Sequence, residues 1–297
     1  MVLKEIVDFI EGSIQFDASA IEVTKALSIA DSNFDISCVG WCSDKNAELL
    51  NSVYSGNVLV SQSLFDQVNV PHLNLIVVDA PRRAFAQLLK EFFTKKKVFG
   101  SVSDSSNIDV TVKYDASKVV IGHNVVIEED VQIGEHVILG HNTVIKSGTI
   151  IKDNVSIGAN CTIGGVGFGY ELSDTGEYEV IPHIGNVILS EHVEIGNNVC
   201  IDRAVMGSTF LDVNVKVDNL VHIAHGVQIG ENSLVIAHAM IAGSVNIGKN
   251  VWVAPSSAVR QKLTIDDNAL IGLGSVVVKN VEKGTVVAGV PAKPISK

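Results

Sequence analysis

Aliphatic residues recur every six positions through most of this chain. The series begins at Ile121, runs to Ile163 and resumes at Leu189 for three positions. After a second break of four residues, it runs without interruption from Leu211 to Val277. All 23 positions of the series are Ile, Leu or Val. An amphipathic helix would repeat its apolar positions every ~3.6 residues, so the pattern indicates another structure.

A period of six is typical of a short flat strand followed by a corner. Three such units form a three-sided coil of about 18 residues, and stacked coils pair as parallel strands around an aliphatic core. Glycine or asparagine near the corners, as in Ile121-Gly122 and Ile133-Gly134, is expected to supply backbone conformations that branched residues resist. The sequence therefore predicts a mainly β fold, a parallel β-helix of hexapeptide repeats with roughly eight coils.

The segment before residue 105 lacks this repeat. Val58–Val60 and Leu75–Val78 are apolar runs typical of buried strands. Asp79-Ala80-Pro81 indicates a helix start with Asp79 as N-cap, and apolar residues then recur at helical spacing from Phe85 to Phe93. Ser101–Asn107, rich in Ser and Asp, is the expected linker. We predict a small α/β domain at 1–105, a β-helix at 106–285 and a C-terminal cap or tail at 286–297.

Composition and charge exclude several classes of function. A net charge of -11 with a pI near 5.2 disfavours a nucleic-acid partner, and the basic run Lys95-Lys96-Lys97 fits the end of the predicted helix. No apolar stretch approaches the roughly 20 residues of a membrane span, and the N-terminus lacks a signal-peptide pattern. The four scattered cysteines form no CxxC pair, so we expect a reduced cytoplasmic protein without a bound metal.

Glycine-rich and polar motifs stand at fixed points of the repeat. The 25-residue interruption at 164–188 holds Gly167-Phe168-Gly169-Tyr170 and Ile181-Pro182-His183-Ile184-Gly185. Later coils hold Ile201-Asp202-Arg203, Asp218-Asn219 and His222-Ile223-Ala224-His225. In this order, the motifs resemble the UDP-3-O-acylglucosamine N-acyltransferases of lipid A synthesis over nearly the whole chain. The resemblance implies that the β-helix is left-handed, that the protein is a homotrimer with active sites between subunits, and that it transfers an acyl group to a nucleotide-linked amino sugar.

Such a reaction needs a base, because an ammonium group has no lone pair with which to attack a thioester. Histidine usually fills this role. The resemblance implies that His225, near a corner and facing outward, is the general base; a surface or interface histidine is the alternative. Asp218, on an adjoining face, is expected to orient His225 or bind the sugar, or else only to cap backbone amides at its corner.

Further substrate contacts follow from the same resemblance. His222, in place of a family glutamine, and Asn219 are expected near the sugar or its phosphates, together with His183. Lys262 takes the place of a second family histidine, and Gly226 takes that of the asparagine after the catalytic histidine. The insertion at 164–188 is predicted to contribute to the active site, where the flat rings of two aromatic residues would contact a sugar or an acyl arm. These two residues are Phe168 and Tyr170. The alternative is that the insertion only packs at a trimer interface.

The nucleobase pocket of the family has counterparts in the N-terminal segment. Trp41 replaces the family aromatic residue, while Asp44 and Ala47 replace an asparagine and a tyrosine. Trp41 is therefore expected to stack on a pyrimidine base, although a lone tryptophan in a small domain also fits a core position.

The acyl donor divides the functional predictions. The ending Ala288–Pro294 resembles that of coenzyme A-dependent sugar acetyltransferases, and a family extension that holds acyl carrier protein has no counterpart here. Gly243, Gly289 and Pro291 are therefore expected to line a coenzyme A channel, with a plain cap of the prism as the alternative for the last two. The first prediction is N-acylation of a dTDP- or UDP-linked amino sugar by acyl-CoA.

Other functions remain as alternatives. One is the lipid A enzyme proper, which takes a 3-hydroxyacyl chain from acyl carrier protein; the acidic chain is mildly unfavourable for such an acidic partner. A non-catalytic β-helix is disfavoured by the set Asp218, His222 and His225. A γ-class carbonic anhydrase is disfavoured because no three-histidine spacing across the coils is convincing.

Overall fold

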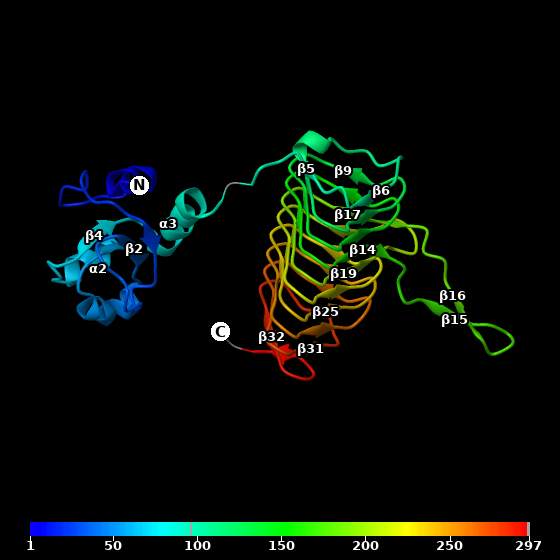
Figure 1. The fold of residues 1–297 in the computed structure, drawn as a ribbon. Coiled ribbons are helices and arrows are strands. Elements are labelled where there is room, and N and C mark those ends of the chain that lie inside the picture. Colours follow the sequence, from blue (N-terminus) through cyan, green and yellow to red (C-terminus); the bar gives the residue numbers. More distant parts are fainter. Residues whose placement is uncertain (96, 296–297) are drawn as a thin grey trace. The chain divides into compact units, whose positions relative to one another are not determined.

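The computed structural model describes residues 1–95 and 97–295, which form two compact units, Met1–Lys97 and Val98–Lys297 (Figure 1). Lys96 of the basic run and the last two residues of the predicted tail, Ser296 and Lys297, lie outside the described residues. Among the described residues, no helix has the length and apolar character needed to cross a membrane. Each unit is described by itself below.

The first unit is a small α/β domain with a parallel sheet in the order β1-β2-β3-β4. The two predicted apolar runs form β3 and β4. The predicted helix begins at Pro81, with Ala80 rather than Asp79 at its N-cap, because the proline takes the first helical position. The strands are β1 (Lys25–Ala26), β2 (Cys38–Trp41), β3 (Asn57–Val60) and β4 (Asn74–Val77). The helices are α1 (Leu3–Phe9), η1 (Asp44–Ser52), α2 (Gln62–Gln67), α3 (Pro81–Leu88) and η2 (Leu89–Phe93).

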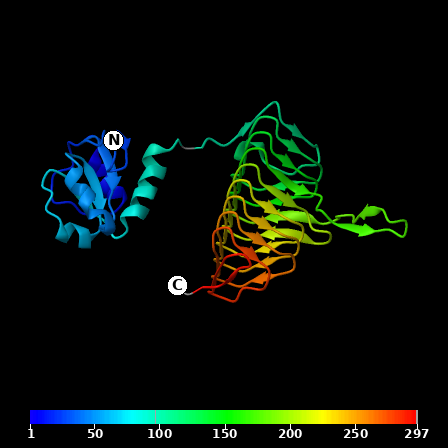
Figure 2. The same cartoon turned by 90° about the horizontal axis from the view of Figure 1, so that it is seen from below.

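The second unit is a three-sided parallel β-helix, and the hexapeptide prediction is confirmed (Figures 1 and 2). Strands pair with the equivalent strand of the next coil, as Ile121 pairs with Leu139, 18 residues further on. All 23 residues of the aliphatic series are buried, none with more than 7% of its surface exposed. They form one continuous core along the prism.

Three sheets form the sides of this prism. The first contains β5 (Ser101–Val102), β7 (Val120–Ile121), β10 (Ile138–Leu139), β13 (Ser156–Ile157), β18 (Glu194–Ile195), β21 (Lys216–Val217), β24 (Leu234–Val235), β27 (Trp252–Val253), β30 (Leu270–Ile271), β32 (Val286–Ala288) and the antiparallel β33 (Lys293–Pro294). The second contains β6 (Asn107–Ile108), β8 (Val126–Ile127), β11 (Val144–Ile145), β14 (Thr162–Gly165), β19 (Cys200–Asp202), β22 (His222–Ile223), β25 (Met240–Ile241), β28 (Ala258–Val259) and β31 (Val276–Val277). The third contains β9 (Gln132–Ile133), β12 (Ile150–Ile151), β17 (Asn186–Leu189), β20 (Ser208–Leu211), β23 (Gln228–Ile229), β26 (Asn246–Ile247) and β29 (Thr264–Ile265). A short helix, η3 (Ala116–Lys118), lies in the first coils.

A second inward row, two residues before the aliphatic one, was not predicted. It is filled by smaller side chains and includes buried hydroxyl groups at Thr143, Ser233 and Ser257. Their oxygens donate hydrogen bonds to carbonyl oxygens of the next coil, 2.8 Å for Thr143 and Ser233 and 3.0 Å for Ser257. The buried polar groups are thus satisfied without a break in the core.

The role predicted for the corner residues is confirmed for asparagine and wrong for the glycines that directly follow the aliphatic position. The left-handed backbone conformation falls three residues after the aliphatic position, where asparagine is common, as at Asn124 (φ 55°) and Asn142 (φ 59°). A glycine directly after the aliphatic residue meets a different demand. A Cβ atom on Gly140 would lie 2.5 Å from the carbonyl carbon of Gly158 in the next coil. Close stacking of coils, rather than a positive φ, therefore requires these glycines.

The linker predicted at Ser101–Asn107 is also wrong. Ser101 and Val102 pair with Val120 and Ile121, so this segment already belongs to the prism. The outer coil has only one neighbouring coil, and its inward Val102 is only partly buried against the core. Polar residues are therefore tolerated there, and the boundary between the two units falls after Lys97 instead of at residue 105.

The long interruption forms an antiparallel hairpin that projects from the prism (Figures 1 and 2). Its strands are β15 (Tyr170–Leu172) and β16 (Tyr178–Val180). The pairs Tyr170–Val180 and Leu172–Tyr178 share one face because side chains alternate along a strand, while Glu171 lies opposite Glu179 on the other face. The hairpin therefore exposes one apolar face and one acidic face.

Candidate active site

A cavity of about 390 Å³ lies on the second unit where consecutive coils meet the start of the insertion. It brings together five residues that the sequence singled out: Phe168, His222, His225, Gly243 and Lys262. The other lining residues are Asp202, Ala224, Met240, Ala242, Ser244 and Gln261.

His225 lines this cavity, two residues after the inward Ile223 of β22. Glycines on two sides allow its position. A Cβ atom on Gly243 would lie 2.6 Å from His225 Nε2, and one on Gly167 would lie 2.9 Å from His225 Cβ. Burial lowers the pKa of His225, and positive charge on His183 acts in the same direction. His225 is therefore kept in the neutral form that a general base requires.

Directly after His225, the chain turns the corner at Gly226 with a positive φ of 68°. Asparagine occupies this position at many other corners, for instance Asn232 and Asn250. Both residue types tolerate the left-handed conformation. The replacement of the family asparagine by Gly226 therefore preserves the backbone path next to the base.

His183 lies behind the cavity and does not line it. Its side chain is buried, with 8% of its surface exposed, and its ring meets that of His225 edge-on at a centroid distance of 5.4 Å. Nδ1 is 2.6 Å from the carbonyl oxygen of Ile181, which can only accept, so Nδ1 carries the proton. The buried Nε2 then has no hydrogen-bond partner among the described residues. The structure thus places His183 against the base, whereas the sequence predicted a substrate contact.

Asp202 is the carboxylate of this cavity, and no role was predicted for it from the sequence. Its side chain is 14% exposed, and Oδ2 lies 3.7 Å from Nε2 of His222. Within the described residues, no hydrogen bond reaches either of its carboxylate oxygens. Burial raises the pKa of Asp202, while charge on His222 and His183 acts in the opposite direction.

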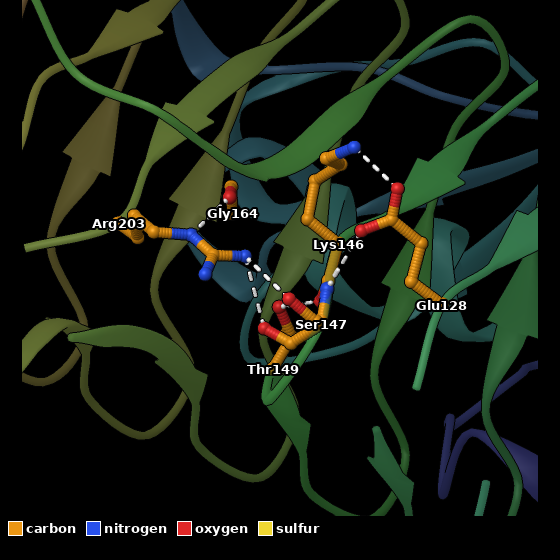
Figure 3. A network of polar contacts seen from close by, with 6 residues as sticks. All are labelled: Glu128, Lys146, Ser147, Thr149, Gly164 and Arg203. Atoms are coloured by element: carbon orange, nitrogen blue, oxygen red, sulfur yellow. Dashed lines mark hydrogen bonds and ion pairs between the residues drawn. The ribbon is translucent and has the colours of Figure 1, made fainter. Parts of the chain in front are cut away.

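Arg203, the next residue, fixes the start of the insertion (Figure 3). Its Nε donates to the carbonyl oxygen of Gly164 at 2.7 Å, and Nη2 donates to the carbonyl oxygen of Ser147 at 3.0 Å. Its backbone N–H also donates to Gly165 at 2.8 Å. The motif Ile201-Asp202-Arg203 therefore places one residue in the core, one in the cavity and one on the loop that carries Phe168.

Ser147, which accepts hydrogen bonds from Arg203, is also hydrogen-bonded to Glu128 (Figure 3). Glu128 forms an ion pair with Lys146 and accepts a hydrogen bond from the backbone N–H of Ser147 at 3.1 Å. Burial raises the pKa of Glu128, but the contacts to Lys146 and Ser147 outweigh it and the net pKa is lowered. The network connects successive coils beneath the insertion.

Within one chain, Asp218 matches its alternative prediction, a cap of corner backbone amides, and Asn219 acts in the same way. Oδ1 of Asp218 accepts from the backbone N–H of Asn219 at 2.7 Å, and Oδ2 accepts from that of Ala237 at 3.3 Å. The side-chain oxygen of Asn219 accepts from the backbone N–H of Asn197 at 2.7 Å. Among the described residues, neither side chain bonds to His225. Both caps act on corner backbone because the preceding strand, β21, belongs to another sheet than β22.

The remaining predicted residues fall into two places. Phe168 lies beside the cavity, 89% exposed, with its ring 4.9 Å from that of Tyr170 at the base of the hairpin. Gly289 and Pro291 lie in the final turn, where Pro291 lines a separate cavity of about 470 Å³ with Val277 and Lys279. Within one chain, these two residues are not brought to His225.

Trp41 lies in the first unit, at the carboxyl end of β2. It packs against the buried cluster that includes Ile76 and Leu88, and it also lines a cavity of about 660 Å³ with Asp44 and Arg82. Both interpretations of Trp41 thus describe part of its surroundings. Ala47 packs against the second core cluster of this unit.

The fold of the second unit is found in solved acyltransferases. The Campylobacter jejuni UDP-N-acetylglucosamine acyltransferase is 20% identical, with 66% of this chain and 74% of that chain covered at a TM-score of 0.58. The Francisella novicida enzyme of the same description is 21% identical, with 65% and 69% covered at a TM-score of 0.60. This likeness shows the fold alone, a left-handed parallel β-helix.

Sequence comparison shows the family. A family model described as bacterial transferase hexapeptide (six repeats) matches residues 116–147 and 130–165. The UDP-3-O-acylglucosamine N-acyltransferase of Campylobacter lari is 42% identical over 98% of this chain and 93% of its own length. That of Campylobacter jejuni subsp. doylei is 38% identical over the same shares. At these identities over nearly the full length, the chain belongs to the UDP-3-O-acylglucosamine N-acyltransferase family of sugar N-acyltransferases.

Proposed function

We propose that this protein transfers an acyl group from a thioester to the free amino group of UDP-3-O-acylglucosamine. The observation that carries the proposal is the cavity that His225, its pKa lowered by burial, lines together with His222 and Asp202. The relatives favour the second predicted function, N-acylation in lipid A synthesis, over acylation of a dTDP-linked sugar.

The reaction uses His225 as the general base. The amine lone pair attacks the thioester carbonyl, and the imidazole of His225 takes a proton from the nitrogen as the carbon–nitrogen bond forms. When the tetrahedral intermediate collapses, the sulfur leaves with the bonding electrons and receives that proton. The lowered pKa of His225 leaves its imidazole free to accept a proton near neutral pH.

The proposed donor is a 3-hydroxyacyl group on acyl carrier protein. The full-length relatives support this donor through the family resemblance, and they give no support to the acyl-CoA prediction. Lys262, which extends the basic side of the cavity, is proposed to contact the substrate or donor phosphates. Phe168 and Tyr170 are proposed to contact the acyl arm, since their exposed rings stand at the cavity and the hairpin base.

The nucleotide is proposed to bind the cavity of the first unit, with Trp41 against the uracil. This cavity lies at the carboxyl ends of parallel strands, the usual ligand-binding edge of such sheets, and its lining includes Arg82 and Arg83. Trp41→Ala should then raise KM more than it lowers kcat, because stacking contributes equally to ground and transition states. An unchanged KM in a folded variant would assign Trp41 to the core alone.

A homotrimer is proposed for the assembly. Leu234, Trp252, Leu270 and Val286 form an apolar outward row in register along the first sheet. The hairpin adds a second apolar surface, and an isolated two-stranded hairpin is only marginally stable in water. A second copy of the chain would cover both. Light scattering at the monomer mass of 31.6 kDa would contradict the trimer.

The experiment that tests the function compares donors on one acceptor. UDP-3-O-acylglucosamine is incubated with 3-hydroxyacyl thioesters of acyl carrier protein and of coenzyme A, and the products are identified by mass. We expect an amide product with the carrier-protein donor at much higher kcat/KM. Preference for acyl-CoA would restore the first prediction for the donor, and no product with either donor would overturn the proposed function.

A further inference from the structure

We propose that Asp202 is the residue that makes the site select an amine over a hydroxyl group as acyl acceptor. This inference rests on the proposed function and adds a specificity-determining residue to it. The feature that motivates it is a nearly buried carboxylate without a hydrogen bond among the described residues, in the same cavity as the base.

The position of Asp202 follows from the register of the second sheet. Cys200 of β19 pairs with His222 of β22, so Asp202 is level with Ala224, the neighbour of His225. Oδ2 of Asp202 lies 3.7 Å from Nε2 of His222. The other titratable groups are His225 and Lys262, which line the cavity, and His183, which packs behind His225. The imidazoles of His222 and His225 and the carboxylate of Asp202 thus line the cavity in which the acceptor is proposed to react.

Partial burial of a carboxylate is costly unless a donor satisfies it, and Asp202 keeps only 14% of its side chain exposed. Neither His222 at 3.7 Å nor any described backbone N–H supplies a hydrogen bond to Asp202. Other carboxylates of the coil corners are satisfied by local amides; Oδ1 of Asp267, for example, accepts from the backbone N–H of Lys249 at 2.9 Å. Since the Asp202 side chain is 14% exposed and lines the cavity, its carboxylate is open to the acceptor, and we infer that the substrate amine donates to it.

An amine acceptor supplies this donor throughout the reaction. A primary amine has two protons: one passes to His225 as the carbon–nitrogen bond forms, and the other remains to donate to Asp202. A hydroxyl acceptor has a single proton, and once His225 has taken it, Asp202 faces an oxygen with no hydrogen to donate. Repulsion between the carboxylate and that oxygen raises the barrier for O-acylation. A site built around a hydrogen bond discriminates strongly against a substrate that lacks it.

The test compares two acceptors in Asp202→Asn. One is UDP-3-O-acylglucosamine, and the other is UDP-3-O-acylglucose, in which a hydroxyl replaces the amino group. We expect kcat/KM for the amine to fall by about 10–100-fold, the effect of losing a hydrogen bond to a charged group. Single-turnover O-acylation, detected by mass with excess enzyme, should stay equal or rise, because the asparagine amide can donate to the oxygen.

Asp212→Asn is the matched control. Asp212 occupies the same place after an inward residue, Leu211, but its Oδ1 accepts from the backbone N–H of Val213 at 2.8 Å and it lies outside the cavity. It should leave the amine-to-hydroxyl ratio unchanged. An amine kcat/KM within about threefold of the wild type, or an equal loss with both acceptors in a folded Asp202→Asn protein, would overturn the proposal. Failure of the wild type to acylate the amine would instead overturn the proposed function.

Discussion

Two aspartates at corners of the β-helix differ in whether their carboxylates are hydrogen-bonded, and this difference separates a structural role from a chemical one. Asp202 and Asp218 each follow an inward aliphatic residue, Ile201 and Val217, directly. The carboxylate of Asp218 accepts hydrogen bonds from two backbone amides of its corner region. That of Asp202 receives none among the described residues and lies in a cavity with two histidines.

The comparison shows that residue type and repeat position do not assign a function here. A satisfied carboxylate stabilises the fold, because it pairs corner amides that would otherwise lack partners. An unsatisfied one beside a neutral histidine costs stability and remains available to a substrate. The following predictions are ways to break or sharpen this distinction, from the largest effect to the smallest.

His225→Ala should have the largest effect. The variant removes the proposed base from the cavity that contains Asp202, and kcat should fall by about 10²–10⁴-fold with little change in KM. Steady-state kinetics with the carrier-protein donor measures it. If the amine arrives neutral and the leaving thiolate takes the proton, the loss would be less than about tenfold. That result would remove the general-base assignment and leave the acyltransferase function in place.

Asp218→Asn should affect stability rather than chemistry. The amide keeps one acceptor oxygen but presents an NH₂ group to a backbone N–H, so one corner donor loses its partner. We expect a loss of about 1–3 kcal/mol in the free energy of unfolding, measured by denaturant titration, with kcat reduced less than about tenfold. A large loss of kcat with unchanged stability would support the orienting role that the sequence predicted for Asp218.

Asp202→Asn should show a small and opposite effect on stability. Burial raises the pKa of Asp202 in the folded chain, so the unfolded chain releases this proton more readily and folding becomes less favourable as the pH rises from the ordinary aspartate range through the raised pKa. The asparagine variant should therefore have a slightly higher Tm than the wild type at neutral pH and no advantage below that range. A lower Tm at neutral pH would mean that the carboxylate is satisfied in solution.

The core of the prism could be predicted from the sequence because one rule governs it. Each inward aliphatic residue has a fixed spacing, and each turned out to be buried, from Ile121 to Val277. Features that depend on contacts between coils escaped this rule. The need for Gly140 comes from Gly158 in the next coil, and β5, at the start of the serine-rich segment 101–107, is recognised only by its pairing with β7.

The site was predicted in part for the same reason. His222 and His225 lie within one repeat, so their neighbourhood follows from local spacing. Asp202 reaches them only through the register between β19 and β22, where 22 residues instead of 18 separate Ile201 from Ile223. The four-residue break in the repeat indicates that the spacing between paired strands changes. Only the strand pairing shows that the change brings Asp202 level with Ala224. Asp218, predicted from its spacing and from the family resemblance, caps corner amides within one chain, which was its alternative prediction.

The central claim, that a neutral His225 is the base beside Asp202, is tested most directly by the pH dependence of kcat/KM. In the wild type, the acidic limb should reflect a pKa below the usual histidine value, because burial and His183 lower the pKa of His225. In His225→Asn, this limb should disappear. An acidic limb that persists unchanged in the folded variant would contradict the account.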